Sequence, residues 1–384
     1  MRLFNFFKRK PKKQNHLSSQ PQPQQRLKIK TEIVTNAIIQ QPNKAEIDLD
    51  VITVETRLKT AIASKHGLYP HEILLLDYAH SFYINDDSFQ NFWWYRYGVR
   101  DVKKVLNSLM VRGFLQEGNL QTTLQKQTIA DIKNVLKTNS LKTTGKKADL
   151  IQRALDNIRE ELLCSYFPKR TYQLTEHGLA ALNEESYVSY IHRHVIEDLD
   201  IWSLNQLIHT EPYMPFRDKI WEYLNKRSMK HFSEHSYGLY INCRLSMAQF
   251  LIEENKYANA LTILAETAIY ELNGIDNIYD HNLDYLEIYA EDFFTYEDSM
   301  TIIFPSIITN ITECQDKLGY SDDELKSFLS IHMKKNKIPV TFFSVEDCVQ
   351  IIIMEKYENK VGLKTLYSNA KKVFKQKYPN IYLR

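Results

Sequence analysis

The chain has 384 residues, of which 43% are hydrophobic and 25% charged, a composition that excludes fibrous proteins and chains disordered throughout. Only 10 residues are glycine, and the sequence has no glycine-rich loop of the kind that wraps nucleotide phosphates, which argues against the familiar nucleotide-dependent enzymes. The formal net charge of +2 is a sum of opposed blocks, because residues 1–30, 99–153 and 359–384 are basic whereas residues 254–330 carry sixteen acidic and three basic side chains. Such blocks predict separate surfaces for separate partners, and the basic ones are candidates for nucleic acid.

Residues 1–53 are predicted to be a disordered segment that is basic and rich in Gln and Pro. Residues 1–30 contain nine Lys and Arg and no acidic residue, and residues 16–25 are mostly Ser, Gln and Pro. No stretch is long and apolar enough for a membrane span, the first residues lack the order of a signal peptide, and the four cysteines form no CxxC pair. We therefore expect a cytoplasmic protein with reduced thiols and no membrane span.

Helical spacing of apolar residues starts near residue 54. Two helices are expected before residue 80, separated at Gly67 and Pro70, and a dense aromatic helix is predicted over residues 89–97. From residue 99 to residue 115 apolar side chains recur every three or four positions, which predicts an amphipathic helix. The polar face of that helix carries Arg100, Lys103 and Lys104.

The surroundings of this basic helix resemble a winged helix-turn-helix domain. Residues 112–115 resemble a helix running into a first wing strand, and residues 172–182 (YQLTEHGLAAL) resemble the second wing strand and the final helix, with Thr175 as its N-cap. The resemblance implies a winged helix over residues 54–125 and 166–190 whose basic helix contacts DNA. Wings normally span a handful of residues, so the long interval between these two predicted wing strands indicates an inserted module.

The interval contains a more specific pattern, over residues 128–155. The sequence predicts a helix capped by Thr128, a turn at residues 144–147 and a second helix that continues to residue 155. The side chains expected to face inward are Ile129, Ile132, Val135, Leu136, Leu150, Ile151 and Leu155. This pattern resembles the SAP domain, a helix-extension-helix module that binds DNA, and the resemblance implies such a module over residues 126–165.

The turn between these two helices is the predicted anion site. Gly145 permits the turn, and the N–H groups that open the next helix lie beside Lys146 and Lys147, where a DNA phosphate can bind. Further contacts are expected from Lys133, Lys137, Lys142, Thr143 and Thr144. None of these groups is suited to base-specific readout, so we expect binding to double-stranded DNA with low sequence specificity. A LEM-like or Rho-N-terminal-like helix pair that contacts protein remains an alternative.

Residues 191–384 are predicted to form an irregular α-helical domain. Residues 240–270 resemble a single tetratricopeptide-like helical hairpin, without a second convincing copy. Between residues 276 and 298 carboxylates alternate with aromatic residues, which indicates either a surface for a basic partner or, as the favoured interpretation, a solvated helix face over an aromatic core. Residues 360–377 predict a basic terminal helix that packs on the acidic block or reaches nucleic acid.

One short motif raises the possibility of catalysis. Residues 231–235 (HFSEH) match the HxxEH pattern of zinc peptidases, which would place His231 and His235 on one helical face with Glu234 as base. His192 and His194 are assigned to an exposed helix surface. No other spacing predicts a catalytic set, so no catalytic residue, metal ligand or cofactor is assigned.

Together these patterns predict a mainly α protein. A winged helix-turn-helix domain with an inserted SAP-like helical module is followed by an irregular, partly tetratricopeptide-like α-helical C-terminal domain. The predicted function is non-enzymatic DNA binding through contacts to the phosphate backbone. The aromatic, Lys-, Asn- and Ile-rich composition resembles SAP-domain proteins of bacteriophages and mobile elements. Two alternatives are an adaptor or structural component that binds a protein partner through the acidic helical domain, and a zinc hydrolase.

Overall fold

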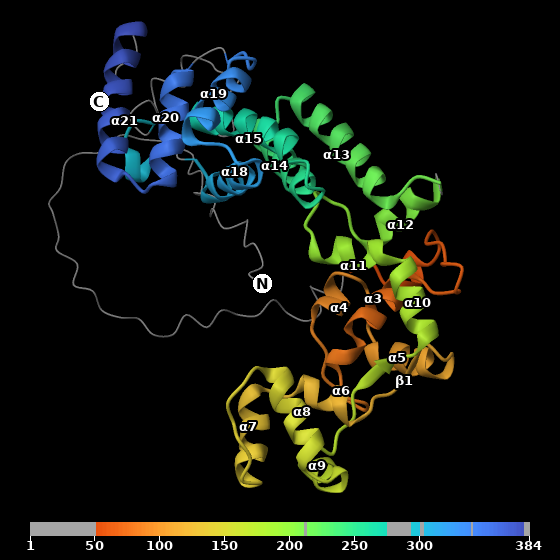
Figure 1. Cartoon of the computed structure of the whole chain (residues 1–384). Coiled ribbons are helices and arrows are strands. Elements are labelled where there is room, and N and C mark those ends of the chain that lie inside the picture. The colour runs from red at the N-terminus through yellow and green to blue at the C-terminus, as the bar shows by residue number, and fades with distance from the viewer. Residues whose placement is uncertain (1–50, 211–212, 275–292, 300–302, 339–340, 380–384) are drawn as a thin grey trace, which may run out of the picture. The chain divides into compact units, whose positions relative to one another are not determined.

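The computed structural model describes residues 51–210, 213–274, 293–299, 303–338 and 341–379 (Figure 1). The described chain is mainly helical, as predicted. Nearly all of the N-terminal segment that was predicted to be disordered lies outside the described residues. None of the helices in the described part of the chain combines the length and the apolar character that crossing a membrane requires.

The first helices contribute aliphatic and aromatic side chains to the main apolar core. They are α2 (Val54–Arg57), α3 (Pro70–Tyr78), η1 (Ala79–Ser81), α4 (Phe92–Tyr95) and α5 (Val102–Val111). The aromatic helix predicted over residues 89–97 is wrong, because only the four residues of α4 are helical there. Aromatic side chains favour helices weakly, and the rings of this segment instead pack on one another, as Trp93 does on Phe92 and Tyr78 at centroid distances of 4.8 and 5.4 Å.

Two short strands follow α5 and are far apart in sequence. Strand β1 (Leu115–Glu117) pairs antiparallel with β2 (Tyr172–Leu174), with Glu117 opposite Tyr172. Thr175 caps the next helix, α10 (Glu176–Glu184), as predicted, because its side chain accepts a hydrogen bond from the Gly178 N–H at 3.0 Å. Gly178 is required by a close approach, since a Cβ there would lie 2.1 Å from the Phe114 carbonyl oxygen.

Four helices fill the interval between the strands, and we call them the inserted module (residues 120–167). They are α6 (Leu120–Lys126), α7 (Ile129–Thr138), α8 (Lys147–Asn157) and α9 (Glu160–Tyr166), and α7 lies beside α8 (Figure 1). The module has its own apolar cluster, distinct from the main core, made of Leu120, Leu124, Ile132, Val135, Leu136, Leu150, Ile151, Ala154, Ile158, Leu163 and Phe167. The cluster therefore begins upstream of residue 126, in α6.

One inward-facing residue of the predicted module is misplaced. The prediction that Ile129 is buried is wrong, because its side chain is 46% exposed. Ile129 opens α7, and only from Ile132 onward do side chains of this helix enter the module's cluster. Leu155 is half-buried and packs against the same cluster.

The remaining helices share one continuous apolar core with the first part of the chain, from Leu68 to Phe374. They are α11 (Ser186–Arg193), α12 (Ile201–Thr210), α13 (Phe216–Ser233), α14 (Tyr237–Glu253), α15 (Tyr257–Leu272), η2 (Tyr296–Asp298), α18 (Pro305–Leu318), α19 (Asp322–Met333), α20 (Val345–Lys356) and α21 (Lys360–Lys377). The hairpin predicted over residues 240–270 is present as α14 and α15. Most of the acidic block between residues 276 and 298 lies outside the described residues.

A histidine–glutamate pair joins α11 to α14, and it gives the fold a predicted pH dependence. His194 Nε2 lies 3.1 Å from the Glu253 carboxylate, and its Nδ1–H donates to the Tyr190 carbonyl. The bond to Glu253 raises the pKa of His194 above its usual value of 6.5. The stabilisation is therefore complete below the unfolded-state pKa and is lost as the pH rises through the raised folded-state pKa.

We expect the urea midpoint of the wild type to fall between about pH 6 and about pH 8.5, and the fall to be smaller in a His194→Gln variant. Equilibrium unfolding of both proteins at the two pH values measures this difference. An equal fall in both proteins would assign the pH dependence to other groups.

Candidate nucleic-acid interface

The segment between α7 and α8 is set by where these two helices end and begin. Thr128 and Asp131 begin α7 with a reciprocal capping box, in which Asp131 N–H donates to Thr128 Oγ1 at 3.1 Å, and the helix ends at Thr138. Residues 142–146, which we call the connection, then lead into α8. The backbone of Gly145 has φ +132°, and a Cβ there would lie 3.2 Å from the Asp149 carboxylate, so that glycine is the residue that fits.

Asp149 modifies the anion site predicted at the start of α8. Its carboxylate accepts a hydrogen bond from the Lys146 N–H at 3.0 Å, which satisfies one of the donors that the sequence assigned to a phosphate. The N–H groups of the first turn after Lys146 have no acceptor one turn earlier in the helix. A phosphate bound here would thus lie beside a carboxylate and would rely on the neighbouring lysines for its positive field.

Those lysines divide into two groups. The exposed side chains around the connection are Lys133, Lys137, Lys142 and Lys146, together with the exposed Thr144 and the half-buried Thr143. Lys147 is different, since its ammonium group donates to the Gln125 carbonyl at the end of α6 at 2.5 Å. A cation near a helix C-terminus is favourable, so Lys147 ties α6 to α8 instead of pointing into solvent.

Arg153 is a residue of this region that the sequence gave no reason to single out. Its Nη1 donates to the carbonyl oxygens of Lys142 at 2.7 Å and Thr144 at 3.0 Å. The guanidinium therefore fixes the backbone of the connection against α8. Only its position in the sequence could have indicated this role. Arg153 lies two turns along α8 from Lys146 and therefore on the same side of the helix as the connection.

We expect Arg153→Ala to loosen the connection without unfolding the module, because it removes two hydrogen bonds from a charged group. Amide hydrogen exchange at residues 142–146 should accelerate, while exchange within α7 stays slow. Gln152→Ala on the same helix is the matched control. Unchanged exchange at the connection in Arg153→Ala would show that these two bonds do not hold it.

The basic face of α5 is partly occupied by contacts within the protein. Lys103 Nζ donates to Asp87 at 2.6 Å, and this bond raises the pKa of Lys103. The prediction that Arg100 lies on this helix is wrong, because α5 begins at Val102 with Asp101 as its N-cap. The Arg100 guanidinium lies 4.5 Å from the centroid of the Trp94 ring, and both Arg100 and Lys104 are exposed. The charge of Lys103 is already paired.

Three uncharged residues of α5 share the exposed face with Lys104. Asn107 and Ser108 are exposed, and the Val111 side chain is 89% exposed. Residues spaced by three and four lie on one side of a helix. The spacing of positions 104, 107, 108 and 111 could therefore have predicted from the sequence that these residues share one face.

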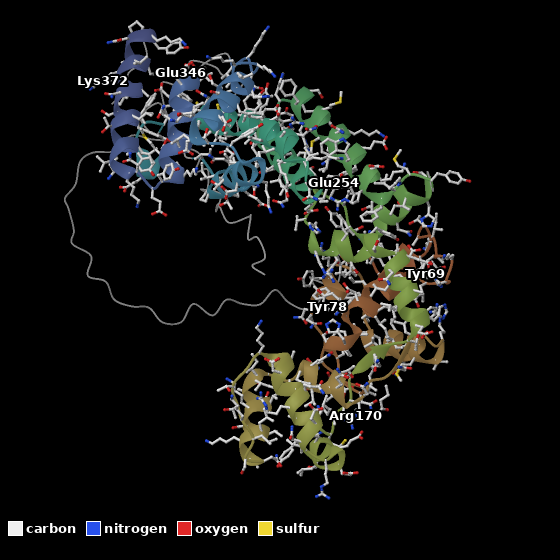
Figure 2. The ribbon with its side chains drawn as sticks, viewed as in Figure 1. Tyr69, Tyr78, Arg170, Glu254, Glu346 and Lys372 are labelled. Carbon is white, nitrogen blue, oxygen red and sulfur yellow. The ribbon has the colours of Figure 1, made fainter. Side chains whose placement is uncertain are left out.

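The inserted module is anchored to the rest of the chain by cationic side chains. The Lys126 ammonium lies 3.4 Å from the centroid of the Tyr83 ring and 3.9 Å from the Asp86 carboxylate, and burial lowers the pKa of Lys126. Arg170, labelled in Figure 2, lies on the segment that returns from the module to β2. Its guanidinium donates to Cys164 Sγ at 2.9 Å and to the Phe167 carbonyl.

The zinc-peptidase geometry expected for the HFSEH motif is wrong. Helix α13 ends at Ser233, and His235 has a left-handed φ of 54°, so His231 and His235 do not share one helical face. His231 is buried, and its Nε2 lies 2.9 Å from the Glu197 carboxylate, to which Arg227 also donates. Across the described ranges no group of three or more His, Cys, Asp or Glu side chains is arranged to hold a metal ion.

His192 is also misassigned, because it is not on an exposed helix surface. Its Nε2 lies 2.6 Å from the Tyr78 hydroxyl, which Figure 2 labels, and its Nδ1 lies 2.5 Å from the Tyr97 hydroxyl. Burial lowers the pKa of His192 to about 4, so the imidazole is neutral at pH 7. Neutral imidazole provides one donor and one acceptor, which fits two tyrosine hydroxyls.

Comparison with known proteins identifies one part of the chain. Residues 123–159 match the family model of the SAP domain. The match covers α7, the connection and α8, and it begins within α6, where the module's apolar cluster also begins. Comparison with the curated proteins gave no match. The chain therefore contains a module of a DNA-binding family, and the match does not extend to its other regions.

Proposed function

We propose that the protein is a non-enzymatic, cytoplasmic DNA-binding protein whose inserted module holds the phosphate backbone of double-stranded DNA. The observation that carries the proposal is the SAP match at residues 123–159, with exposed lysines within the connection and on α7 before it. Lysine contacts to phosphates release counterions and depend little on base sequence. The cysteines of the described chain are free thiols, in keeping with a reducing compartment.

A second DNA contact is proposed at α5. The order of elements along the chain is that of a winged helix, which supports that assignment. After α3 comes Tyr83, which forms an isolated bridge with Thr171, and then α4, α5 and the β1–β2 pair. In such a domain the helix in the position of α5 enters the major groove. Lys104 would contact phosphate, and Asn107 and Val111 would face base edges, where an amide pairs with adenine and a methyl group meets thymine.

The experiment that tests the proposal is a titration of the full chain with a mixed-sequence DNA duplex at several salt concentrations. Binding through phosphates predicts an affinity that falls steeply and linearly, on logarithmic axes, as the salt concentration rises. Absence of binding at low salt would rule the proposal out. Comparing duplexes of different sequence then separates the two contacts, because only the α5 face contains groups suited to base readout.

A further inference from the structure

Lys103 lies at the edge of the α5 face that is proposed to contact DNA. Successive residues of a helix advance by about 100°, so Lys103 lies about 100° around α5 from Lys104 and about 40° from Asn107. A helix in the major groove has a phosphate backbone along each of its flanks. A lysine at the edge of such a helix is therefore placed to contact phosphate and not the base edges.

The ammonium group of Lys103 is bonded to a carboxylate from an earlier segment of the chain. Its Nζ lies 2.6 Å from Asp87 Oδ1. The carboxylate of Asp101 also acts on Lys103, but Asp101 is the N-cap of α5 and accepts a hydrogen bond from the Lys104 N–H at 2.8 Å. Asp87 is thus the carboxylate that pairs directly with Lys103.

The chain just before Asp87 is fixed, so this carboxylate extends toward α5 from a defined point. The Asp86 N–H donates to the Tyr83 carbonyl at 3.1 Å, and the Tyr83 N–H donates to the Asp86 carboxylate at 2.9 Å. The Ile84 N–H donates to the carbonyl of Arg170, labelled in Figure 2, at 2.8 Å. These bonds hold residues 83–86 against the segment that leads into β2.

The bond between Asp87 and Lys103 is much more exposed than the contacts of Asp86. The side chain of Asp87 is 83% exposed, whereas that of Asp86 is 24% exposed and lies 3.9 Å from the Lys126 ammonium. An exposed ion pair contributes little to stability and is screened by salt. A DNA phosphate can therefore displace the Asp87 carboxylate from Lys103 without unfolding the turn that precedes it.

We propose that Asp87 is an internal competitor of DNA phosphate, whose carboxylate occupies Lys103 and thereby lowers the affinity of α5 for DNA. The proposal rests on the proposed contact between α5 and DNA. When α5 enters the groove, the Lys103 ammonium either leaves Asp87 for a phosphate or stays paired and leaves that phosphate contact unmade. Both outcomes give weaker binding than a Lys103 that has no carboxylate partner. Asp87 thus limits how strongly this helix holds the DNA backbone.

The test compares two aspartate-to-asparagine variants of the full chain. Asp87→Asn removes the competing charge and keeps the shape of the side chain. Asp323→Asn is the matched control, because the Asp323 side chain is 92% exposed and pairs with a lysine, Lys326, at 2.9 Å. Both changes are also made in a Lys103→Gln background. Affinity for a mixed-sequence duplex is measured against salt concentration, and circular dichroism confirms that every variant is folded.

Asp87→Asn is expected to bind the duplex several-fold more tightly than the wild type at low salt, because Lys103 gains a phosphate contact. The slope of log affinity against log salt should become steeper by about 0.9, the value for one contact. Asp323→Asn should change that slope by less than half as much. In the Lys103→Gln background Asp87→Asn should lose most of its gain, because that background has no ammonium group at position 103.

Equal effects of the two asparagine variants would overturn the proposal. A gain from Asp87→Asn that is undiminished in the Lys103→Gln background would also overturn it, because the carboxylate would then act by repulsion and not by competition. Failure of the proposed function gives a different result, since neither the wild type nor any variant would bind DNA at low salt. A wild type that binds DNA, with an Asp87→Asn variant that binds no better, would overturn this proposal alone.

Discussion

Replacing Lys137, Lys142 and Lys146 together with glutamine is expected to lower the slope of log affinity against log salt by about 2.7, because three phosphate contacts are lost. All three side chains are exposed, and none belongs to the apolar cluster of the inserted module, so the module should remain folded. Affinity should fall most at low salt, and it should fall for every duplex sequence alike.

A matched triple variant makes this result specific. Lys230, Lys256 and Lys326 are lysines outside the inserted module and α5, each paired with a nearby carboxylate. Their replacement with glutamine removes the same net charge and should change the slope by much less. Similar losses in the two triple variants would mean that the overall charge of the protein, and not the connection, determines binding. Lys147→Gln should act differently, by removing the hydrogen bond between α8 and the end of α6.

Gly178→Ala is expected to destabilise the protein by about 3 kcal/mol, although alanine is the better helix former. The added Cβ would lie 2.1 Å from the Phe114 carbonyl oxygen, so either α10 or the start of β1 must move. Phe114 is buried and belongs to the main core, which leaves little room for that movement. The urea midpoint should fall accordingly.

Ala180→Gly is the control for Gly178→Ala, because Ala180 is exposed on the same helix. That change should cost about 1 kcal/mol through helix propensity alone. If Gly178→Ala instead raised the midpoint, the close approach of α10 to Phe114 would not exist in solution. Binding of DNA by the inserted module should survive Gly178→Ala, since the module has a separate apolar cluster.

The inserted module could be predicted closely from the sequence because its signals are local. Thr128 as a cap, Gly145 in the turn and apolar residues at helical spacing all lie within about 30 residues, and each has one structural meaning. Thr175 was predictable for the same reason. The exposure of Ile129 was not, because periodicity gives the face of a helix and not how far the partner helix extends along it.

Several of the errors concern contacts between distant segments. His192 reaches Tyr78 and Tyr97, and His231 reaches Glu197, through packing that no local pattern specifies. Lys147 and Lys103 were assigned to DNA from their charge and from the two family resemblances, yet each already has a partner within the protein. Charge and spacing indicate where a basic surface lies, whereas the three-dimensional structure decides which of its cations remain available.

The strand pair β1–β2 has a further consequence for the inserted module. Glu117 and Tyr172 face each other across the ladder, and the Gly118 N–H donates to the Thr171 carbonyl at 2.8 Å, so the chain leaves and re-enters its host at neighbouring points. Paired residues of antiparallel strands lie about 5 Å apart, a gap that a tight turn can close. Residues 120–170 can therefore be moved as a unit. We expect that, placed on another hairpin, they would keep their own fold and the proposed DNA binding, and that β1 and β2 could be joined by a short turn or by another insertion.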